Sequence, residues 1–368
     1  MSLFGKPKSQ SFLGIDVGVH GMKLVEMQNE KGRAKLMTYA YSERGLEEQS
    51  KSLLDNPQVA AHLLSALVKK SGATTTRAVS GLPQNAVFSA IVTVPKMKDP
   101  RQMKPLIESQ LAKLTPIPVT EMILDSKIIE EEKTKVDPSS KKEDEKKAAP
   151  VDPKKGDTVR VLVTGAAKTL VQKYVEVFKL AKIELVALET ESFALIRALV
   201  GRDRSTILII DMGAMRTNMT IVEKGIPIFT RSVNVGGGQL TKTIAEQMGI
   251  SLEDAEQMKV DLSKGQMNSV PPQVELILQP ILTEINYSFG EFKRLEQDSA
   301  KRVEKIIITG GSANLPGMVT YLSQKLNINT YVGDPWARVQ LPQALRPVLD
   351  EIGPRFAVCV GLAMRDME

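Results

Sequence analysis

The sequence predicts an α/β protein whose two related halves face a shared cleft. The main observation is an internal repeat: residues 12–27 and 207–222 superpose without a gap, and each reads as a strand, an Asp-x-Gly turn and a second strand. The equivalent pairs are Asp16 and Asp211, Gly18 and Gly213, and Lys23 and Asn218. Glycine runs also follow two later strand patterns, at 236–238 and 310–311. Glycine-rich turns thus recur at the ends of strands in both halves.

The two hairpins have the chemistry of a phosphate site. Four apolar residues at 207–210 predict a strand buried on both faces, and Asp211 follows at the mouth of the sheet, where α/β folds bind ligands. Gly213 permits a tight turn with exposed backbone N–H groups. Two such hairpins can hold a chain of phosphates, and two carboxylates can hold Mg²⁺ through its water shell. Either hairpin alone would fit an ordinary tight turn, so the repetition carries the interpretation.

The composition limits the kinds of protein and of site that this chain can form. A chain of 368 residues with 42% hydrophobic and 25% charged residues can form two domains with sizeable cores. The single cysteine, Cys359, excludes an internal disulfide and lies in an apolar run that predicts a buried, unreactive thiol. Two histidines and one cysteine argue against a zinc site, and 4% aromatic residues without an interleaved basic cluster argue against nucleic-acid binding. No apolar run is long enough for a membrane span, and no signal peptide is recognisable.

The first half is predicted to begin with three strands, a helix and a fourth strand. The first hairpin supplies two strands and residues 34–41 the third. Residues 57–71 have apolar positions at helical spacing and end before Gly72, and residues 77–82 form the next strand. This order differs from the alternating βα pattern of a dinucleotide-binding fold.

A small α+β region is predicted next. It consists of strands at 87–94, 121–129 and 159–164, a helix that begins at Asp99, and a helix at 170–181. Residues 130–157 interrupt it with eight lysines, nine acidic residues and no aromatic residue. That composition cannot bury enough apolar surface to offset the entropy of ordering, so it predicts a disordered loop.

The second half is predicted to surround the second hairpin. A helix at 185–200 carries Glu189 and Glu191 and leads into the hairpin. Afterwards come a strand at 227–235, helices that begin near Leu240 and Ser251, a helix at 274–295, a strand at 303–309 and a last helix at 354–364. The glycines at 236–238 could present free N–H groups to a phosphate or could serve close backbone packing.

These motifs, in this order, resemble the actin-like ATPase superfamily over almost the whole chain. The set comprises two Asp-x-Gly hairpins, a glycine run before a helix, an Ala-Glu-x-x-Lys helix and a strand followed by Gly-Gly-Ser-x-x-Leu-Pro-Gly. Within the superfamily the sequence is most similar to the PilM family of type IV pilus assembly, and next to the FtsA family. The resemblance implies an actin-like two-lobed fold with duplicated ribonuclease-H-like halves and an inserted α+β subdomain. The implied subdomains are 1–80 with 189–205 (1A), 81–188 (1C, the insert), 206–236 with 303–368 (2A) and 237–302 (2B).

The resemblance also implies a site for ATP and Mg²⁺. Its phosphate motifs are Asp16, Gly18, Gly21 and Lys23, then Asp211, Gly213 and Thr217, and then Gly236, Gly237 and Gly238. Its nucleoside contacts are Glu256, Lys259, Gly310, Gly311, Ser312 and Met318. Asp16 and Asp211 would hold the metal, and either Glu189 or Glu191 would position the attacking water. An ordinary surface ion pair would equally explain Glu256 and Lys259.

The chain departs from the superfamily pattern in both phosphate loops. Val19 and His20 replace hydroxyl residues in the first loop, and Ala214 and Met215 do so in the second. Nucleotide binding is therefore better supported than hydrolysis, and slow ATPase activity is the most that is expected.

The resemblance implies an ATP-binding scaffold at the inner membrane in a type IV pilus or related secretion complex. The resemblance implies a cytoplasmic chain. Because no membrane span is predicted, the chain would be tethered through a partner, which the resemblance gives as the cytoplasmic N-terminal tail of a PilN-like bitopic protein. That tail would dock near the insert, where Val92, Leu106 and Leu111 could line a groove or belong to the core. Motor ATPases and a second copy of the chain are further expected partners, whereas nucleic acid is not.

Two alternatives belong to the same superfamily. An FtsA-like division protein is disfavoured because the residues after 364 leave no room for a C-terminal amphipathic membrane helix. A small-molecule kinase is disfavoured because no extra Asp-bearing loop is recognisable as the base for an acceptor hydroxyl.

Overall fold

The computed structural model describes residues 10–45, 52–97, 99–129, 158–263, 270–296 and 300–367. The chain divides into two compact units. The main unit is Met1–Val87 with Thr169–Glu368, and the insert unit is Phe88–Lys168. The segment 130–157, predicted to be disordered, lies outside the described residues.

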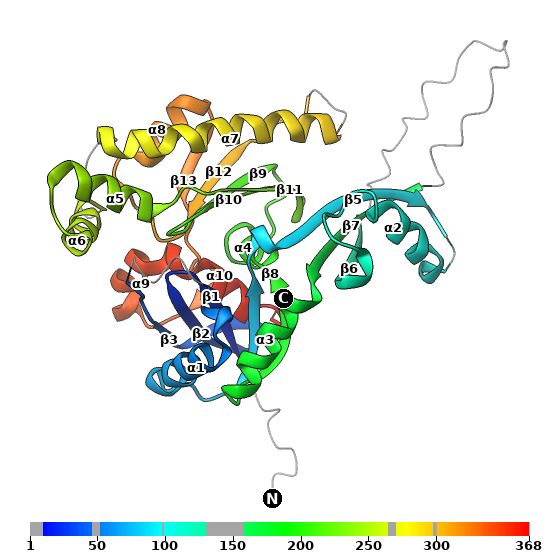
Figure 1. Ribbon diagram of the computed structural model, residues 1–368, viewed down its shortest axis with the longest axis horizontal. Helices are drawn as coiled ribbons and strands as arrows, with labels where there is room; N and C mark the ends of the chain where they lie inside the picture. The colour runs from blue at the N-terminus through cyan, green and yellow to red at the C-terminus, as the bar shows by residue number, and fades with distance from the viewer. Residues whose placement is uncertain are drawn as a thin grey trace, which may run out of the picture. The chain divides into compact units, whose positions relative to one another are not determined.

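The main unit contains two sheets. The first has the strand order β14-β3-β2-β1-β4-β8. Its strands are β1 (Ser11–Gly18), β2 (Gly21–Glu30), β3 (Arg33–Tyr41), β4 (Arg77–Leu82), β8 (Glu184–Thr190) and β14 (Val339–Gln340). The first hairpin, β1–β2, is antiparallel and pairs Asp16 with Lys23, while β4 runs parallel to both β1 and β8. Helix α1 (Pro57–Ser71) packs against β2 and β3, and helix α3 (Lys168–Leu180) directly precedes β8 in the sequence (Figure 1).

The second sheet repeats the hairpin. Its order is β11-β10-β9-β12-β13. The strands are β9 (Ile207–Met212), β10 (Thr217–Glu223), β11 (Ile226–Val233), β12 (Lys305–Thr309) and β13 (Asn329–Val332). The second hairpin, β9–β10, is antiparallel and pairs Asp211 with Asn218. These are the positions that match Asp16 and Lys23 in the sequence repeat, so the predicted duplication is confirmed at the level of strand register.

Helices from residues 237–326 lie on the side of the second sheet (Figure 1). They are α5 (Gly237–Met248), α6 (Leu252–Ser263), α7 (Pro272–Glu296) and α8 (Met318–Leu326). Helix α5 packs against α6 and α7, and α7 packs against β11. The hydroxyl of Ser251 accepts a hydrogen bond from the N–H of Asp254, which caps the first turn of α6 at the predicted start of the helix. Among the described helices, none combines the length and apolar character that crossing a membrane requires.

One short helix joins the cores of the two halves. All seven residues of α10 (Ala357–Ala363) are buried, and the surrounding core includes side chains from both sheets, such as Phe12 and Ile209. The backbones approach closely: a Cβ on Gly14 would lie 2.0 Å from the carbonyl oxygen of Cys359. Cys359 is itself fully buried, as predicted, and burial raises the pKa of its thiol.

The insert unit is a small α+β structure. Its sheet has the order β5-β7-β6, formed by β5 (Val87–Pro95), β6 (Met122–Ile129) and β7 (Thr158–Ala167), and its helix is α2 (Lys104–Leu111). The core contains Val92, Val94, Met103, Ile107, Leu111, Val161 and Val163. The unit lies within the insert predicted at 81–188. Residues 81–82 and 184–188 of that range lie in β4 and β8 of the six-stranded sheet.

The predicted helix at 185–200 is wrong in its first part. Residues 184–190 form β8, followed by α4 (Glu191–Leu195) and a π-helical turn (Ile196–Val200). Leu185 and Ala187 pair with Ala78 and Val79 of β4, so hydrogen bonding along a sheet edge prevails over the helical spacing of apolar residues. Strands β13 and β14 and helix α9 (Arg346–Ile352) had not been predicted.

Candidate functional site

Two adjoining cavities lie in the main unit, with volumes of about 350 and 240 Å³. We call the larger one the carboxylate cavity, because Asp16, Asp211 and Glu191 line it, and the smaller one the Glu256 cavity. They share eight lining residues: His20, Lys23, Gly213, Ala214, Gly310, Gly311, Pro354 and Arg355. Together they form one cleft between the first hairpin, the second hairpin and the loop after β12.

The carboxylate cavity is built on paired strand positions. Lys23 Nζ lies 2.8 Å from Asp16 Oδ2 across the first hairpin. On the second hairpin the amide of Asn218 interacts with Asp211. Ser232 Oγ donates a hydrogen bond to Asn218 Oδ1 at 2.7 Å, which turns the amide nitrogen of Asn218 toward the carboxylates.

Glu191 completes the group of carboxylates from the first residue of α4. Its Oε2 accepts a hydrogen bond of 2.9 Å from the backbone N–H of Gln84. A longer contact of 3.5 Å joins the same oxygen to Asn218 Nδ2. Both contacts hold the carboxylate where the chain enters α4.

The charges in this group perturb the ionisation of Glu191 and Asp211. Desolvation, with the charges of Asp16 and Asp211, raises the pKa of Glu191 to about 8. Desolvation and the charge of Asp16 raise the pKa of Asp211 to about 6, although Lys23 and the Asn218 amide oppose the shift. Desolvation is the largest single effect on Lys23 and lowers its pKa, but the charge of Asp16, the hydrogen bond to Asp16 and the charges of Cys359 and Asp211 together outweigh it, so the pKa is raised. The cavity therefore favours a proton or a cation beside Glu191 and Asp211.

This arrangement suits a hydrated magnesium ion. Among the described residues, no group of three or more His, Cys, Asp or Glu side chains is placed to hold a metal directly. Mg²⁺ commonly keeps several waters and uses one or two carboxylates together with substrate phosphates. Asp16 and Asp211 line the same cavity, and the charge of Asp16 disfavours ionisation of Asp211. A hydrated divalent cation would relieve that repulsion.

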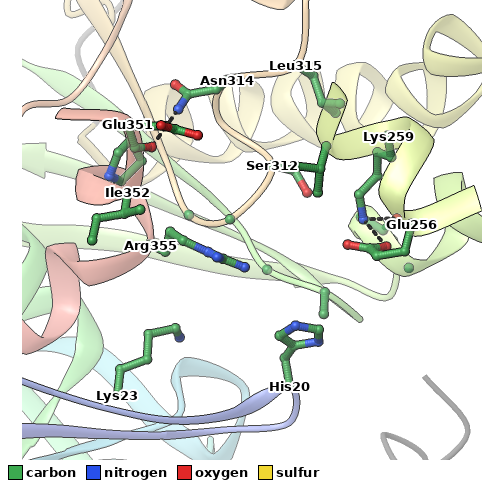
Figure 2. Close-up of a pocket in the computed structure, with 18 residues that line it drawn as sticks. His20, Lys23, Glu256, Lys259, Ser312, Asn314, Leu315, Glu351, Ile352 and Arg355 are labelled. Carbon is green, nitrogen blue, oxygen red and sulfur yellow. Dashed lines mark hydrogen bonds and ion pairs between the residues drawn. The ribbon is translucent and has the colours of Figure 1, made fainter. Parts of the chain in front are cut away.

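The Glu256 cavity contains an ion pair that is fixed in place. Lys259 Nζ lies 2.6 Å from Glu256 Oε2 and donates to Thr241 Oγ1 at 3.0 Å. Desolvation lowers the pKa of Lys259, and attraction to Lys259 lowers the pKa of Glu256 against its own desolvation. Figure 2 shows this pair and Ser312 across the cleft from His20 and Lys23. The pair is therefore part of a cavity wall and not an ordinary exposed ion pair.

The glycines at 236–238 serve close packing. The N–H groups of Gly237 and Gly238 donate to the carbonyl oxygens of Gly213 and Ala214, at 2.9 and 2.7 Å. A Cβ on Gly237 would lie 2.3 Å from Ser312 Oγ. Of the two explanations for this glycine run, phosphate binding and close packing, the hydrogen bonds support close packing of α5 against the second hairpin. Gly237 and Gly238 nevertheless line the cleft.

Gly310 is required by the backbone. Its φ is +92°, and a Cβ there would lie 2.5 Å from both Asp211 Oδ1 and the carbonyl oxygen of Met212. Gly311 differs, because the nearest atom to an added Cβ is Arg355 Nε at 3.9 Å. Gly310 thus lets the loop cross the second hairpin, whereas Gly311 leaves open space in the cleft.

Five residues of the predicted site do not line either cavity. Thr217 and Met318 are fully buried, and Thr217 Oγ1 donates to the carbonyl oxygen of Val235 at 2.7 Å. Gly21 and Gly236 pack against backbone. Glu189 forms two hydrogen bonds with Arg197, at 2.7 and 2.9 Å. Of the two glutamates, Glu191 is the one that faces the cleft.

Arg355 of the cleft, and Gln84, which contacts Glu191 from outside the cavity lining, had not been predicted. Arg355 lines both cavities and lies 3.2 Å from Glu43, and its position after Gly353 and Pro354 gave no recognisable signal. Gln84 had no signal either, because its contribution to Glu191 is a backbone N–H. His20 lines both cavities, and desolvation lowers its pKa despite the nearby Glu43.

Comparison with solved structures shows the actin-like fold. The PilM–PilN type IV pilus biogenesis complex matches with a TM-score of 0.74 and 23% identity, over 97% of this chain and 98% of that chain. EutJ from Carboxydothermus hydrogenoformans matches with a TM-score of 0.53 and 16% identity, over 98% and 90%. MreB5 of Spiroplasma citri bound to ADP matches with a TM-score of 0.51 and 13% identity, over 96% and 95%. The predicted fold class is confirmed.

Sequence comparison points to two related families. FtsA from Agrobacterium fabrum is 26% identical over 176 residues, which are 42% of this chain and 38% of that protein. FtsA from Bacillus subtilis is 25% identical over 224 residues, 54% of this chain and 51% of that protein. The chain thus spans about two fifths to one half of these curated relatives. The family model described as type IV pilus assembly protein PilM matches residues 14–142 and 147–367. Because that match covers nearly the whole chain, the chain belongs to the PilM family of type IV pilus assembly proteins.

Proposed function

We propose that this chain binds Mg²⁺-ATP in the cleft and acts as an actin-like scaffold in a type IV pilus or related secretion complex. The observation that carries the proposal is the meeting of three loops in one cleft. The Asp16–Lys23 hairpin, the Asp211–Asn218 hairpin and the Gly310–Gly311 loop all line the carboxylate cavity. Two of these loops come from the repeated halves, so the duplication itself creates the site.

The triphosphate would lie between the two hairpins. Lys23 supplies an ammonium group there, and Asp16 and Asp211 would hold the hydrated Mg²⁺ that the phosphates carry. The nucleoside would occupy the Glu256 cavity. Carboxylate and ammonium groups at Glu256 and Lys259 suit ribose hydroxyls and ring nitrogens, and Gly311 leaves room for a flat ring.

Hydrolysis would depend on Glu191 and would be slow. With a pKa of about 8, this side chain is mostly protonated at neutral pH in the absence of ligand and is then a poor base. Bound Mg²⁺ would supply positive charge that favours the ionised form. Neither phosphate loop offers a hydroxyl at the four positions named above, so Glu191 would have to orient water with little help. We therefore assign ATP binding as the principal activity.

A bitopic membrane protein is the proposed tether. The support is family membership and the likeness to a PilM–PilN complex, which together favour a PilN-like cytoplasmic tail as the partner. This chain would then be cytoplasmic and peripheral to the inner membrane. In the insert unit, Val92 and Leu111 belong to the core, whereas Leu106, Leu114 and Ile123 are exposed. The exposed apolar residues are the available contacts for such a tail on this unit.

A division role like that of FtsA has weaker support. The FtsA matches cover 42% and 54% of this chain, whereas the PilM family model covers nearly all of it.

A fluorescent peptide of a PilN-like tail, titrated against the purified protein, tests the partner assignment. Micromolar binding, about −8 kcal/mol, is expected, and absence of binding with or without Mg²⁺-ATP would contradict the assignment.

Thermal unfolding tests nucleotide binding. A ligand at a hundredfold its dissociation constant adds about 2.7 kcal/mol to the free energy of unfolding, so Mg²⁺-ATP should raise the melting temperature by several degrees. Gly311→Gln fills the cleft without a backbone clash and should remove the shift. The matched control is Gly290→Gln in α7, where an added Cβ meets no atom within 4 Å. A wild-type protein that no nucleotide stabilises would overturn the proposal.

A further inference from the structure

Gln84 is a buried amide with every hydrogen-bonding group in use. It opens a short 3₁₀-helix, Gln84–Ala86, directly after β4 and Pro83. Its Nε2 donates to the carbonyl oxygens of Met219 and Arg231, at 3.0 Å each. Its Oε1 accepts from Ser192 Oγ at 3.1 Å and from Thr220 Oγ1 at 2.9 Å. A primary amide has two donors and two acceptor lone pairs, so nothing remains for solvent.

These partners attach Gln84 to the second sheet. Met219 and Thr220 lie on β10, which carries Asn218 of the second hairpin, and Arg231 lies on β11. Two residues before Gln84, the chain ends β4 of the first sheet at Leu82. Pro83 is therefore the single residue between the end of β4 in the first sheet and Gln84, whose side chain is hydrogen-bonded to the second sheet. A movement of β10 relative to β4 that keeps these hydrogen bonds would therefore be taken up at Pro83 and in the side chain of Gln84.

The same segment leads from the cavity to the insert unit. Pro83, Asn85 and Ala86 line the carboxylate cavity, and the first segment of the main unit ends at Val87. The chain returns to the main unit at Thr169, and the next residue, Leu170, also lines the cavity. Both covalent connections to the insert unit thus pass the place where the phosphates are proposed to bind.

We propose that Gln84 is a positioning residue that couples occupancy of the carboxylate cavity to the connection at residues 85–88. The inference rests on the proposed function, because the ligand is Mg²⁺-ATP. A ligand held by both hairpins draws β10 toward the first hairpin, and Gln84 moves with β10. The backbone N–H of Gln84 also holds Glu191, so the connection responds to contacts at that carboxylate as well. The insert unit would thereby receive a nucleotide-dependent signal through its own covalent attachment.

Amide hydrogen exchange measures this coupling. The N–H of Ala86 donates to the carbonyl oxygen of Pro83 at 2.9 Å, and that of Val87 donates to the carbonyl oxygen of Gln84. Saturating Mg²⁺-ATP should change exchange over residues 84–88 of the full chain about tenfold, which corresponds to 1.4 kcal/mol of local opening free energy. Helix α1, which lines neither cavity, is the internal reference.

The test variant is Gln84→Met, which keeps the backbone N–H to Glu191 and removes all four side-chain hydrogen bonds. The nucleotide-induced rise in melting temperature should persist, while the nucleotide-induced change in exchange at 84–88 should fall below about twofold. Gln279→Met is the control, because Gln279 makes an exposed hydrogen bond to Tyr321 on α8. Should Gln84→Met fail to fold, Thr220→Val removes one of the four bonds and should reduce the exchange response in part.

The outcomes are separable. A wild-type protein that Mg²⁺-ATP stabilises without any change in exchange at 84–88 would overturn the coupling alone. A Gln84→Met protein that binds nucleotide and keeps the full exchange response would overturn it too. If no nucleotide stabilises the wild-type protein, the proposed function fails and the coupling falls with it.

Discussion

Lys23 faces Asp16 across the first hairpin, with Nζ 2.8 Å from Oδ2, whereas Asn218 takes the equivalent place opposite Asp211. The repeated hairpins thus share a backbone register but differ by one positive charge. That difference is consistent with the raised pKa of Asp211, about 6, whose first cause is desolvation. The second half of the cleft is accordingly where an added cation is most favoured.

Removing the ammonium of Lys23 should weaken nucleotide binding. A charge-assisted hydrogen bond contributes about 1.5–3 kcal/mol, so Lys23→Met should raise the ATP dissociation constant roughly tenfold to a hundredfold. Fluorescence titration with a labelled ATP analogue measures it. Lys305→Met, which breaks a 2.7 Å pair with Asp203 outside the cleft lining, should leave the constant unchanged. An affinity close to wild type would show that Lys23 does not contact the phosphates.

The ligand-free protein should lose stability as the pH rises from about 4 to 9. The pKa values of Asp211 and Glu191 in the folded state, about 6 and about 8, exceed the reference values of 3.8 and 4.5. Each raised pKa contributes stability that is fully present below the reference value and is lost as the pH rises through the folded value. The loss should be on the order of a few kcal/mol. Chemical denaturation across this pH range measures it.

Glu191→Gln supplies the control for that pH profile. The amide cannot ionise, so the profile should be flatter than in the wild-type protein. The difference should be clearest between about pH 6 and 8, where folded Glu191, with a pKa of about 8, still holds a proton that the unfolded chain has released. Mg²⁺-ATP should flatten the wild-type profile in the same direction. An unchanged slope in the variant would show that Glu191 titrates normally in the folded chain.

Substitution of Glu191 should affect ATP turnover, whereas substitution of Glu189 should affect the stability of the fold. Glu191→Gln should abolish any slow ATP turnover and leave nucleotide affinity within a few-fold. Glu189→Gln should instead leave the guanidinium of Arg197 without its carboxylate, and breaking a buried pair typically costs about 3–5 kcal/mol. Turnover assays and denaturant unfolding of both variants distinguish the roles. Loss of turnover in a Glu189→Gln protein that unfolds like wild type would reverse the assignment.

The packing of α10 against β1 should tolerate no side chain at Gly14. An added Cβ would lie 2.0 Å from the carbonyl oxygen of Cys359, so Gly14→Ala should lower the free energy of unfolding by at least about 3 kcal/mol. Gly290→Ala, at an open position inside α7, should instead raise it by up to about 1 kcal/mol. A stable Gly14→Ala protein would mean that α10 can shift away from the first sheet.

Local sequence patterns determined the hairpins and most helices. Asp16 and Asp211 each follow a continuous apolar run near the end of a strand, and the turn glycines come two residues later. Such signals are short-range, because strand alternation, turn chemistry and helix caps depend on neighbouring residues. Helix α1 illustrates this, since Asn56 caps its first turn and Gly72, at φ +69°, follows its last residue.

Tertiary structure decided which of the candidate groups face the cleft. Glu189 and Glu191 are two residues apart, yet Glu189 lies near the end of β8 beside Arg197 and Glu191 begins α4 at the cavity. The reason is that residues 184–190, for which the sequence spacing predicted a helix, pair with β4 as a strand. The glycines at 236–238 looked equally suited to phosphate binding and to packing, and their N–H partners came from a hairpin about 20 residues earlier. Contacts between distant segments settle such choices, since a side chain's partner depends on where the sheets meet and not on its own neighbours.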